Sequence, residues 1–233
     1  GVLEWMSQQM AGCGGKTAVI GISGGKDSST VAALAAAAYG RDHVYGVLMP
    51  NGVQPDIDYS QALVEHLNIP HCTINIHDAV QGVLHEMEQA GLEPSRQTRV
   101  NLPSRMRMLT LYAVAASENR LVAGTGNRSE AYMGYFTKWG DGAYDFNPIA
   151  DLTVTEIYEF LTWLHAPENI IRKAPSAGLF EGQTDEQEMG VTYAAIDKYI
   201  LTGEASEHDK AIIDRYHSRS EHKRRPAATY HAE

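Results

Sequence analysis

The chain has few cysteines and no long apolar run. Only two of its 233 residues are cysteines, Cys13 and Cys72, which is too few for a disulfide framework or a four-thiolate zinc site. No apolar stretch approaches the roughly 20 residues that span a bilayer. The N-terminus also lacks the basic and apolar segments of a signal peptide. These absences predict a cytoplasmic protein that does not interact with a membrane.

Positive charge is scarce as well. The chain has 19 basic and 29 acidic residues, which gives a formal net charge of −10, whereas a general nucleic-acid binder usually has a basic surface. Hydrophobic residues make up 43% and charged residues 21%, as in ordinary globular proteins. We therefore expect residues 1–233 to form a single domain that binds no nucleic acid.

Short β-branched runs alternate with helix-forming segments in the first half of the chain. The expected strands are 17–22, 43–49, 71–76 and 120–124. The expected helices are 27–39, 59–67, 79–89 and 105–118. This alternation predicts an α/β fold with a Rossmann-like parallel sheet and helices on both faces.

The pattern becomes helical beyond Pro148. The helices expected there are 153–165, 184–201 and 207–218. Ligands of doubly wound sheets bind beyond the carboxyl ends of the strands. The loops that follow the expected strands are therefore the candidate binding segments, namely 21–29, 49–56, 77–78 and 124–130.

A glycine- and serine-rich loop follows the first expected strand. It reads Gly21-Ile22-Ser23-Gly24-Gly25-Lys26-Asp27-Ser28 and opens a helix. Paired glycines let backbone N–H groups approach a phosphate, and a helix N-terminus attracts an anion. Asp27 would repel phosphate unless it binds a Mg²⁺ ion that bridges phosphate oxygens. The alternative is a glycine-rich turn in which Asp27 only partners the helix dipole.

The loop is not a Walker A motif, because Ile20 occupies the first glycine position and Asp27 replaces the Ser/Thr after the lysine. It resembles the Ser-Gly-Gly-x-Asp-Ser signature of the ATP-pyrophosphatase (PP-loop) superfamily. Those enzymes cleave ATP to AMP and pyrophosphate and adenylate a substrate oxygen. The resemblance implies that ATP is a co-substrate bound along residues 21–28, with Lys26 and Asp27 as catalytic residues.

Six later motifs occur in an order that resembles the NAD synthetase family. They are Asn101–Met108, Gly124–Glu130, Gly134–Gly142, Asp145–Pro148, Lys173–Ala177 and Glu221–Pro226. The resemblance implies ATP-dependent amidation of nicotinic acid adenine dinucleotide (deamido-NAD) with ammonia and Mg²⁺. The products would be NAD, AMP and pyrophosphate, formed through an adenylated intermediate. It also implies a homodimer with the dinucleotide site at the subunit interface.

The same resemblance assigns site residues by position. Thr125 and Ser176 would contact ATP together with the loop. Asp27 and Glu130 would hold Mg²⁺. The residues expected to contact deamido-NAD are Arg105, Lys138, Asp145, His222 and Lys223. Cationic side chains among them suit a substrate that carries a pyrophosphate and a carboxylate.

Several of these residues also fit simpler structural roles. Glu130 could be a first-turn helix acid, and Lys138 with Asp141 could form a solvated pair. The basic segment 222–225 could be a disordered tail, as charge runs often are. The aromatic residues of segment 135–139 could cap the core or stack on a nicotinate or adenine ring.

Two positions depart from better-known bacterial members of the family. Val154 stands where many relatives have a lysine that contacts ATP phosphates, and Leu48 replaces an arginine. Both changes remove positive charge near the expected ATP site. We expect other cations to compensate, with Lys26, Arg128 and Lys173 as the candidates.

Two rival functions remain open from the sequence. One is another PP-loop ATP-pyrophosphatase, such as a tRNA-modifying enzyme, although the scarce cysteines and acidic charge count against it. The other is a nucleotide-binding regulatory module with reduced turnover. The chain begins shortly before the glycine-rich loop, so we expect no glutaminase domain and ammonium as the nitrogen source. A separate glutaminase partner remains possible, and glycines in segment 174–190 suit a lid.

Overall fold

The computed structural model describes residues 1–13, 17–54, 57–163, 166, 168 and 184–230. Within them, a four-stranded parallel sheet has the strand order β3-β2-β1-β4. Its strands are β1 (Thr17–Gly21), β2 (Val44–Leu48), β3 (His71–Thr73) and β4 (Arg120–Val122). The predicted parallel sheet is therefore confirmed, although β3 and β4 end earlier than the β-branched runs indicated.

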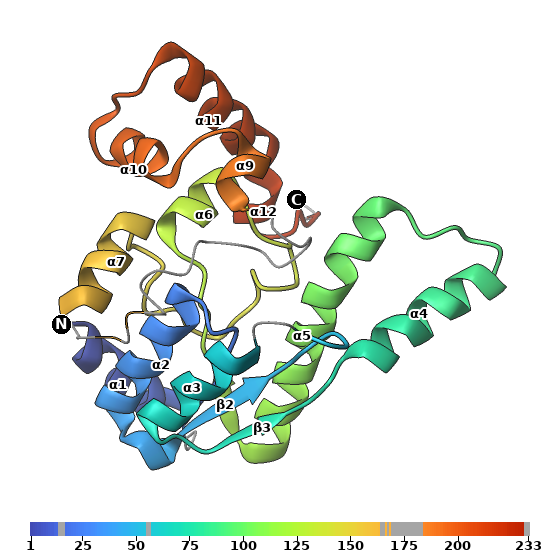
Figure 1. Ribbon diagram of the computed structural model, residues 1–233, viewed down its shortest axis with the longest axis vertical. Coiled ribbons are helices and arrows are strands. Elements are labelled where there is room, and N and C mark those ends of the chain that lie inside the picture. The colour runs from blue at the N-terminus through green and yellow to red at the C-terminus, as the bar shows by residue number, and fades with distance from the viewer. Residues whose placement is uncertain (14–16, 55–56, 164–165, 167, 169–183, 231–233) are drawn as a thin grey trace.

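Helices cover both faces of the sheet (Figure 1). On one face lie α1 (Val2–Cys13), α2 (Lys26–Tyr39) and α3 (Ile57–Leu67), and α7 (Val154–Trp163) packs with them. On the other face lie α4 (His77–Gln89) and α5 (Arg96–Glu118). A short 3-10 helix, η1 (Arg41–His43), leads into β2.

Alternation along the strands explains the two layers. In β1, Ala18 and Ile20 pack into the cluster with α1, α2 and α3, whereas Val19 packs into the cluster with α4 and α5. All three side chains are fully buried. Successive side chains of a strand point to opposite faces, so a continuous apolar run is what a doubly covered strand requires.

A third group of helices lies above the sheet, near the C-terminus of the chain (Figure 1). Its members are α6 (Arg128–Met133), α9 (Asp185–Met189), α10 (Tyr193–Thr202), α11 (Glu207–Arg219) and α12 (Glu221–Arg224). Their apolar residues, together with Val154 from α7, form a core cluster that includes Met133, Tyr193 and Ile213. The predicted helical C-terminal part is confirmed.

The largest differences from the predicted helices concern α5, the segment 184–201 and α1. Helix α5 begins at Arg96, not Arg105, because Ser95 caps it through the Thr98 N–H and the helix runs through Pro103. The expected helix 184–201 is divided into α9 and α10, since Gly190 adopts a left-handed conformation with φ 76° and ends α9. Helix α1 was not expected.

Across the described ranges, no helix combines the length and apolar character that a membrane span would need.

Candidate functional site

The glycine-rich loop connects β1 to α2 and is shaped by close packing. Gly24 has φ +68°, and a Cβ atom there would lie 2.7 Å from the main-chain nitrogen of Ser60. Only glycine fits both conditions. The loop is closed by Ser23 and Ser28, whose hydroxyl oxygens lie 3.1 Å apart, while the Ser23 N–H donates to Ser28 Oγ at 3.3 Å.

The N-terminus of α2 faces the space beside this loop. Its N-cap residue, Gly25, has no side chain that could accept from the first-turn N–H groups. Such groups, with the positive end of the helix dipole, favour a bound anion. The loop therefore has the backbone geometry of a phosphate site, which agrees with the role expected for residues 21–28.

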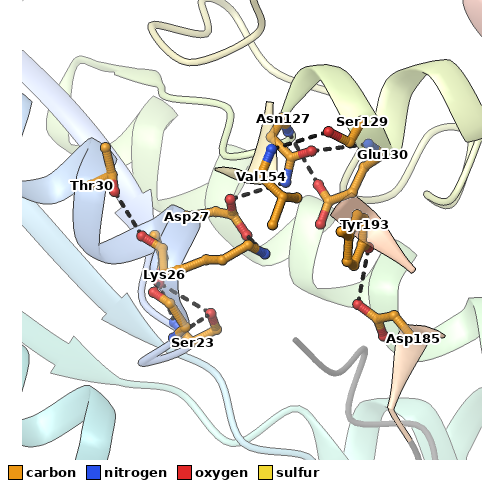
Figure 2. A network of polar contacts seen from close by, with 12 residues as sticks. Ser23, Lys26, Asp27, Thr30, Asn127, Ser129, Glu130, Val154, Asp185 and Tyr193 are labelled. Carbon is orange, nitrogen blue, oxygen red and sulfur yellow. Dashed lines mark hydrogen bonds and ion pairs between the residues drawn. The ribbon is translucent and has the colours of Figure 1, made fainter. Parts of the chain in front are cut away.

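The loop after β4 meets the glycine-rich loop at the point where the strand order reverses. Strands β2 and β3 lie on one side of β1 and β4 lies on the other, so the switch point is between β1 and β4. Asn127 Nδ2 donates to Asp27 Oδ1 at 3.0 Å across this junction. Figure 2 shows Asp27 and Lys26 directed toward Asn127 and Glu130. This is where ligands of doubly wound sheets bind.

Asn127 and Glu130 together form the N-terminus of α6. The Asn127 side chain accepts from the Glu130 N–H at 2.9 Å, and Glu130 Oε2 accepts from the Asn127 N–H at 3.1 Å. This reciprocal pair is a capping box. Glu130 is therefore a first-turn helix acid, as the structural alternative held, and it also stands beside Asp27. The same carboxylate thus caps α6 and lies near Asp27, while its binding of Mg²⁺ stays a prediction.

Three charged groups share this buried junction. Lys26 is only 5% exposed, and its Nζ lies 2.8 Å from Asp27 Oδ2. Burial, followed by the charge of Asp27, raises the pKa of the Glu130 carboxyl to about 8, although Lys26 opposes the increase. Burial lowers the pKa of the Lys26 ammonium, but Asp27 and Glu130 outweigh this, so its pKa lies above the usual value. Lys26 therefore stays charged and partly neutralises the two carboxylates.

The donor set of the junction fits Mg²⁺ better than a metal that needs an all-protein cage. No group of three or more His, Cys, Asp or Glu side chains suited to a metal occurs in the described part of the chain. Mg²⁺ commonly binds through one or two carboxylates together with waters and substrate phosphates. Asp27 and Glu130 are two carboxylates next to a phosphate-type loop that could hold such an ion.

Helix α10 supports the junction through residues that the sequence reading did not single out. The Lys26 ammonium lies over the ring of Tyr193, 5.6 Å from its centroid. The Tyr193 hydroxyl donates to Asp185 Oδ2 at 3.3 Å. Burial, followed by the charges of Glu130 and Asp185, raises the pKa of Tyr193, which therefore remains neutral. No local motif marked these contacts, because they join segments far apart in sequence.

A buried carboxylate ties α10 to α6 and α7. Asp197 is 2% exposed. It accepts from Ser129 Oγ at 2.5 Å and from both the N–H and the hydroxyl of Thr155, at 2.8 and 2.6 Å. Ser129 directly precedes Glu130, so this network fixes the turn that carries Glu130. Three such hydrogen bonds to one buried carboxylate rigidify a polar core.

The residues expected to bind deamido-NAD lie around the loop after α6 and α12. Lys138 Nζ donates to the His222 carbonyl at 2.6 Å, and Arg105 Nε donates to the Lys138 carbonyl at 3.3 Å. Lys223 Nζ donates to the carbonyls of Gly134 and Phe136, at 2.8 and 2.6 Å. The structure thus brings together the side chains or main chain of Arg105, Lys138, His222 and Lys223.

The alternative that the basic segment 222–225 is a disordered tail is wrong for the described residues. Residues 221–224 form α12, and Arg224 donates to the carbonyls of Ala131 and Tyr132, both at 3.2 Å. Gly134 makes this contact possible, because a Cβ atom there would lie 2.0 Å from Ser220 Cβ. The basic segment is therefore docked against the end of α6.

The remaining predicted site residues are placed as follows. Asp145 is engaged within the protein: its Oδ2 accepts from the Val122 N–H at 2.7 Å and its Oδ1 from the Tyr112 hydroxyl at 3.1 Å. Thr125 lies in the loop after β4, two residues before Asn127. Ser176 and most of the expected lid 174–190 lie outside the described residues.

The two departures from the family pattern occupy core positions. Leu48 is fully buried among the residues between the sheet and α2, and Val154 is 3% exposed in the C-terminal cluster. Among the candidate compensating cations, Arg128 pairs with Asp151 at 3.7 Å near the surface. Lys26 is at the junction, and Lys173 lies outside the described residues.

The class of this protein is defined by a parallel sheet, a phosphate-type loop after its first strand and an acidic pair at its switch point. It is that of nucleotide-binding α/β proteins of the ATP-pyrophosphatase type. Comparison with known sequences identifies the family within this class. The sequence profile described as NAD synthase matches residues 2–228. The chain belongs to the NAD synthase family.

Individual relatives agree with this membership. The NH3-dependent NAD+ synthetase of Carboxydothermus hydrogenoformans is 43% identical over 226 residues, covering 96% of this chain and 93% of the relative. Among solved structures, the NMN synthetase of Francisella tularensis is 40% identical with a TM-score of 0.92, covering 98% of this chain and 95% of that one. The NH3-dependent NAD synthetase of Campylobacter jejuni is 26% identical with a TM-score of 0.81, covering 99% and 96%.

Proposed function

We propose that this protein amidates the nicotinate carboxylate of deamido-NAD, using ATP and ammonia, to give NAD, AMP and pyrophosphate. The observation that carries the proposal is the hydrogen-bonded junction between Asp27 and Asn127, which joins a phosphate-type loop to the turn bearing Glu130. Family membership supports the reaction, because a relative with 43% identity is named an NH3-dependent NAD+ synthetase.

The junction suits adenylation of a carboxylate. A carboxylate is a poor acyl donor because its leaving group would be oxide, and adenylation replaces that group with AMP. Asp27 and Glu130 would hold a Mg²⁺ ion, which offsets the charge on the departing pyrophosphate when bound. The backbone N–H groups of residues 23–28 would position the polyphosphate for attack by the substrate oxygen. No nucleophilic side chain is needed for this chemistry.

The cationic residues near α12 suit the acceptor substrate. Lys138 and Arg105 come from different segments but meet through the Lys138 carbonyl. Trp139, which is 55% exposed, follows Lys138 and offers a ring surface for stacking. We propose that this group receives the dinucleotide, with Thr125 and Ser176 contacting ATP as the family resemblance implies.

The direct test mixes the purified protein with ATP, Mg²⁺, ammonium and deamido-NAD. We expect NAD, AMP and pyrophosphate to form in equal amounts. Glutamine in place of ammonium should not support turnover by the pure chain. Formation of ADP and phosphate would contradict the proposal. No ATP cleavage in the presence of deamido-NAD would also contradict it and would favour the regulatory-module alternative.

A second substrate deserves the same test, because the Francisella tularensis structure with 40% identity and TM-score 0.92 is an NMN synthetase. Amidation of nicotinate mononucleotide would give NMN through the same ATP chemistry. Both substrates present a nicotinate carboxylate, and they differ in whether an adenylate group is attached to the mononucleotide.

The two acceptors are separated by measuring kcat/KM for each under identical ATP, Mg²⁺ and ammonium concentrations. The first proposal expects a higher kcat/KM for deamido-NAD. A higher value for nicotinate mononucleotide would transfer the assignment to NMN synthesis without changing the roles of Asp27 and Glu130.

We also propose that the active form is a homodimer that pairs through α5. This helix projects beside α4 away from the C-terminal helices (Figure 1), and Ala115, at 4% exposed, is the one residue of α5 that is buried. Leu109 is 59% exposed, one helical turn after Arg105. An exposed leucine one turn from a proposed substrate residue fits a dinucleotide site at the interface.

The dimer is tested by light scattering after size-exclusion chromatography. Wild-type protein should have the mass of two chains, and Leu109→Glu should shift it toward one chain with loss of activity. Leu201→Glu is the matched control, because Leu201 is similarly exposed on α10. A monomeric wild-type protein that is fully active would contradict the proposal.

A further inference from the structure

The ammonium group of Lys26 lies within the candidate metal site. This residue begins α2, is 5% exposed, and has its Nζ 2.8 Å from Asp27 Oδ2. The ring of Tyr193 lies on another side of it, 5.6 Å away. Burying an ammonium is unfavourable unless opposite charge surrounds it. Lys26 therefore depends on the same carboxylates that are candidates for holding Mg²⁺.

The position of Lys26 matters because the loop signature leaves this residue variable. Val154, in the first turn of α7, packs in the same apolar cluster as Tyr193. The ammonium of Lys26 stands over that tyrosine and acts electrostatically on Tyr158, in the second turn of α7. The chain thus places a cation from the loop between α10 and α7.

The charges at the junction constrain what can bind there. Asp27, Glu130 and Lys26 together carry two potential negative charges and one positive charge. A divalent cation added to this group would leave positive charge in excess in a buried site, where electrostatic interactions are strong. The polyphosphate of a nucleotide would remove that excess, and a long lysine side chain can turn toward it.

We propose that Lys26 is an internal counter-ion that opposes divalent-cation binding to Asp27 and Glu130 until a nucleotide polyphosphate is present. Metal binding then becomes conditional on nucleotide binding, and the acidic pair does not hold a metal alone. This inference deepens the proposed function and rests on it for the identity of the nucleotide. The acceptor substrate plays no part in it.

The test measures binding of Mn²⁺ alone to the full chain, without nucleotide, by electron paramagnetic resonance. Wild-type protein should bind Mn²⁺ with a Kd weaker than about 1 mM, the weak end for biological divalent sites. Lys26→Met, which keeps length and removes charge, should lower that Kd at least roughly tenfold. Lys26→Arg is the matched control and should bind Mn²⁺ as weakly as wild type.

The location of the Mn²⁺ site is tested by adding Asp27→Asn to Lys26→Met, which should abolish the gained affinity for Mn²⁺. Circular dichroism shows whether each variant is folded, and Lys26→Gln replaces Lys26→Met if the latter is not. Tight Mn²⁺ binding to wild-type protein would overturn the proposal without any variant. The proposal would also be overturned if the folded, uncharged variant bound Mn²⁺ no more tightly than wild type. It would likewise be overturned if the gain in Mn²⁺ affinity persisted after Asp27→Asn was added. None of these outcomes depends on whether deamido-NAD is amidated.

Discussion

The junction of the loops after β1 and β4 differs in construction from the region around α12. At the junction, charged side chains contact one another: Lys26 pairs with Asp27, and Asn127 bonds to Asp27. Near α12, cations bond instead to main-chain carbonyls, as Lys138 does to that of His222 and Lys223 to that of Phe136. The first arrangement holds charged and polar side chains against one another, and the second fixes the path of a loop while its cations stay partly exposed.

This difference implies that the two regions contribute to different kinetic constants. Substitutions at the junction should lower kcat, because charge there acts on the departing pyrophosphate. Substitutions near α12 should raise KM for the acceptor, because surface cations contribute mainly to ground-state binding. Four substitutions test this separation.

The largest effect is expected for Asp27→Asn. Removing the carboxylate that faces Lys26 and Asn127 should lower kcat by about a hundredfold or more, because an electrostatic stabiliser of this kind is lost. The measurement is AMP formation under saturating substrates, with the fold checked by circular dichroism. Asp42→Asn, at an exposed position in η1, is the control. Near-normal kcat in Asp27→Asn would remove Asp27 from the metal site.

Lys138→Ala should raise the KM for deamido-NAD by about tenfold, because one charge-assisted contact to an anionic substrate is lost. The KM for ATP should stay unchanged. Initial rates with each substrate varied in turn provide both constants. Lys198→Ala removes an exposed lysine paired with Glu204 on the C-terminal helices and should change neither constant. A change in the KM for ATP alone would contradict the assignment of Lys138 to the deamido-NAD site.

Asn127→Ala should combine a stability loss with a severalfold lower kcat. The stability loss should be about 1 kcal/mol, because the N-cap of α6 is removed. Turnover should fall because Asp27 loses its hydrogen bond across the junction. Ser206→Ala removes the N-cap of α11 and should cause a similar loss of stability alone. Equal activity in the two variants would mean that Asn127 is only a helix cap.

The smallest effect on activity is expected for Arg224→Met. This arginine donates to carbonyls at the end of α6 and to that of His217, and charged hydrogen bonds contribute about 1.5–3 kcal/mol each. The midpoint of thermal unfolding should fall clearly, while kcat at lower temperature stays near that of wild type. Arg225→Met, at a more exposed neighbour, should barely change the midpoint. A large loss of kcat in folded Arg224→Met would place this arginine in the site.

The sequence predicted the sheet well, because a short continuous apolar run such as Ala18–Ile20 is typical of a strand that is covered on both faces. It predicted the start of α5 poorly. The helix begins at Arg96 behind the Ser95 cap and continues through Pro103, although a proline inside a helix removes a backbone hydrogen bond. The division between α9 and α10 was signalled by Gly190, whose left-handed conformation was not anticipated.

The junction was predictable only in part. Asp27 and Glu130 were identified through motifs, and the Asn127-x-x-Glu130 spacing of a capping box could also have indicated Asn127. The contacts with Tyr193 and Asp197 could not be read from the sequence, because they depend on how α10 packs against α6 and α7. The direction of the Lys26 side chain, into the acidic pair, is likewise a product of tertiary packing.

The central claim is that the substrate carboxylate is adenylated by ATP at this junction. It is tested most directly by labelling the carboxylate oxygens of the acceptor with oxygen-18 and analysing the products by mass spectrometry. Attack by the carboxylate on the α-phosphorus transfers one labelled oxygen to AMP when ammonia displaces it. We predict AMP that carries one labelled oxygen and unlabelled pyrophosphate. Unlabelled AMP formed together with the amide product, or label in pyrophosphate, would contradict the account.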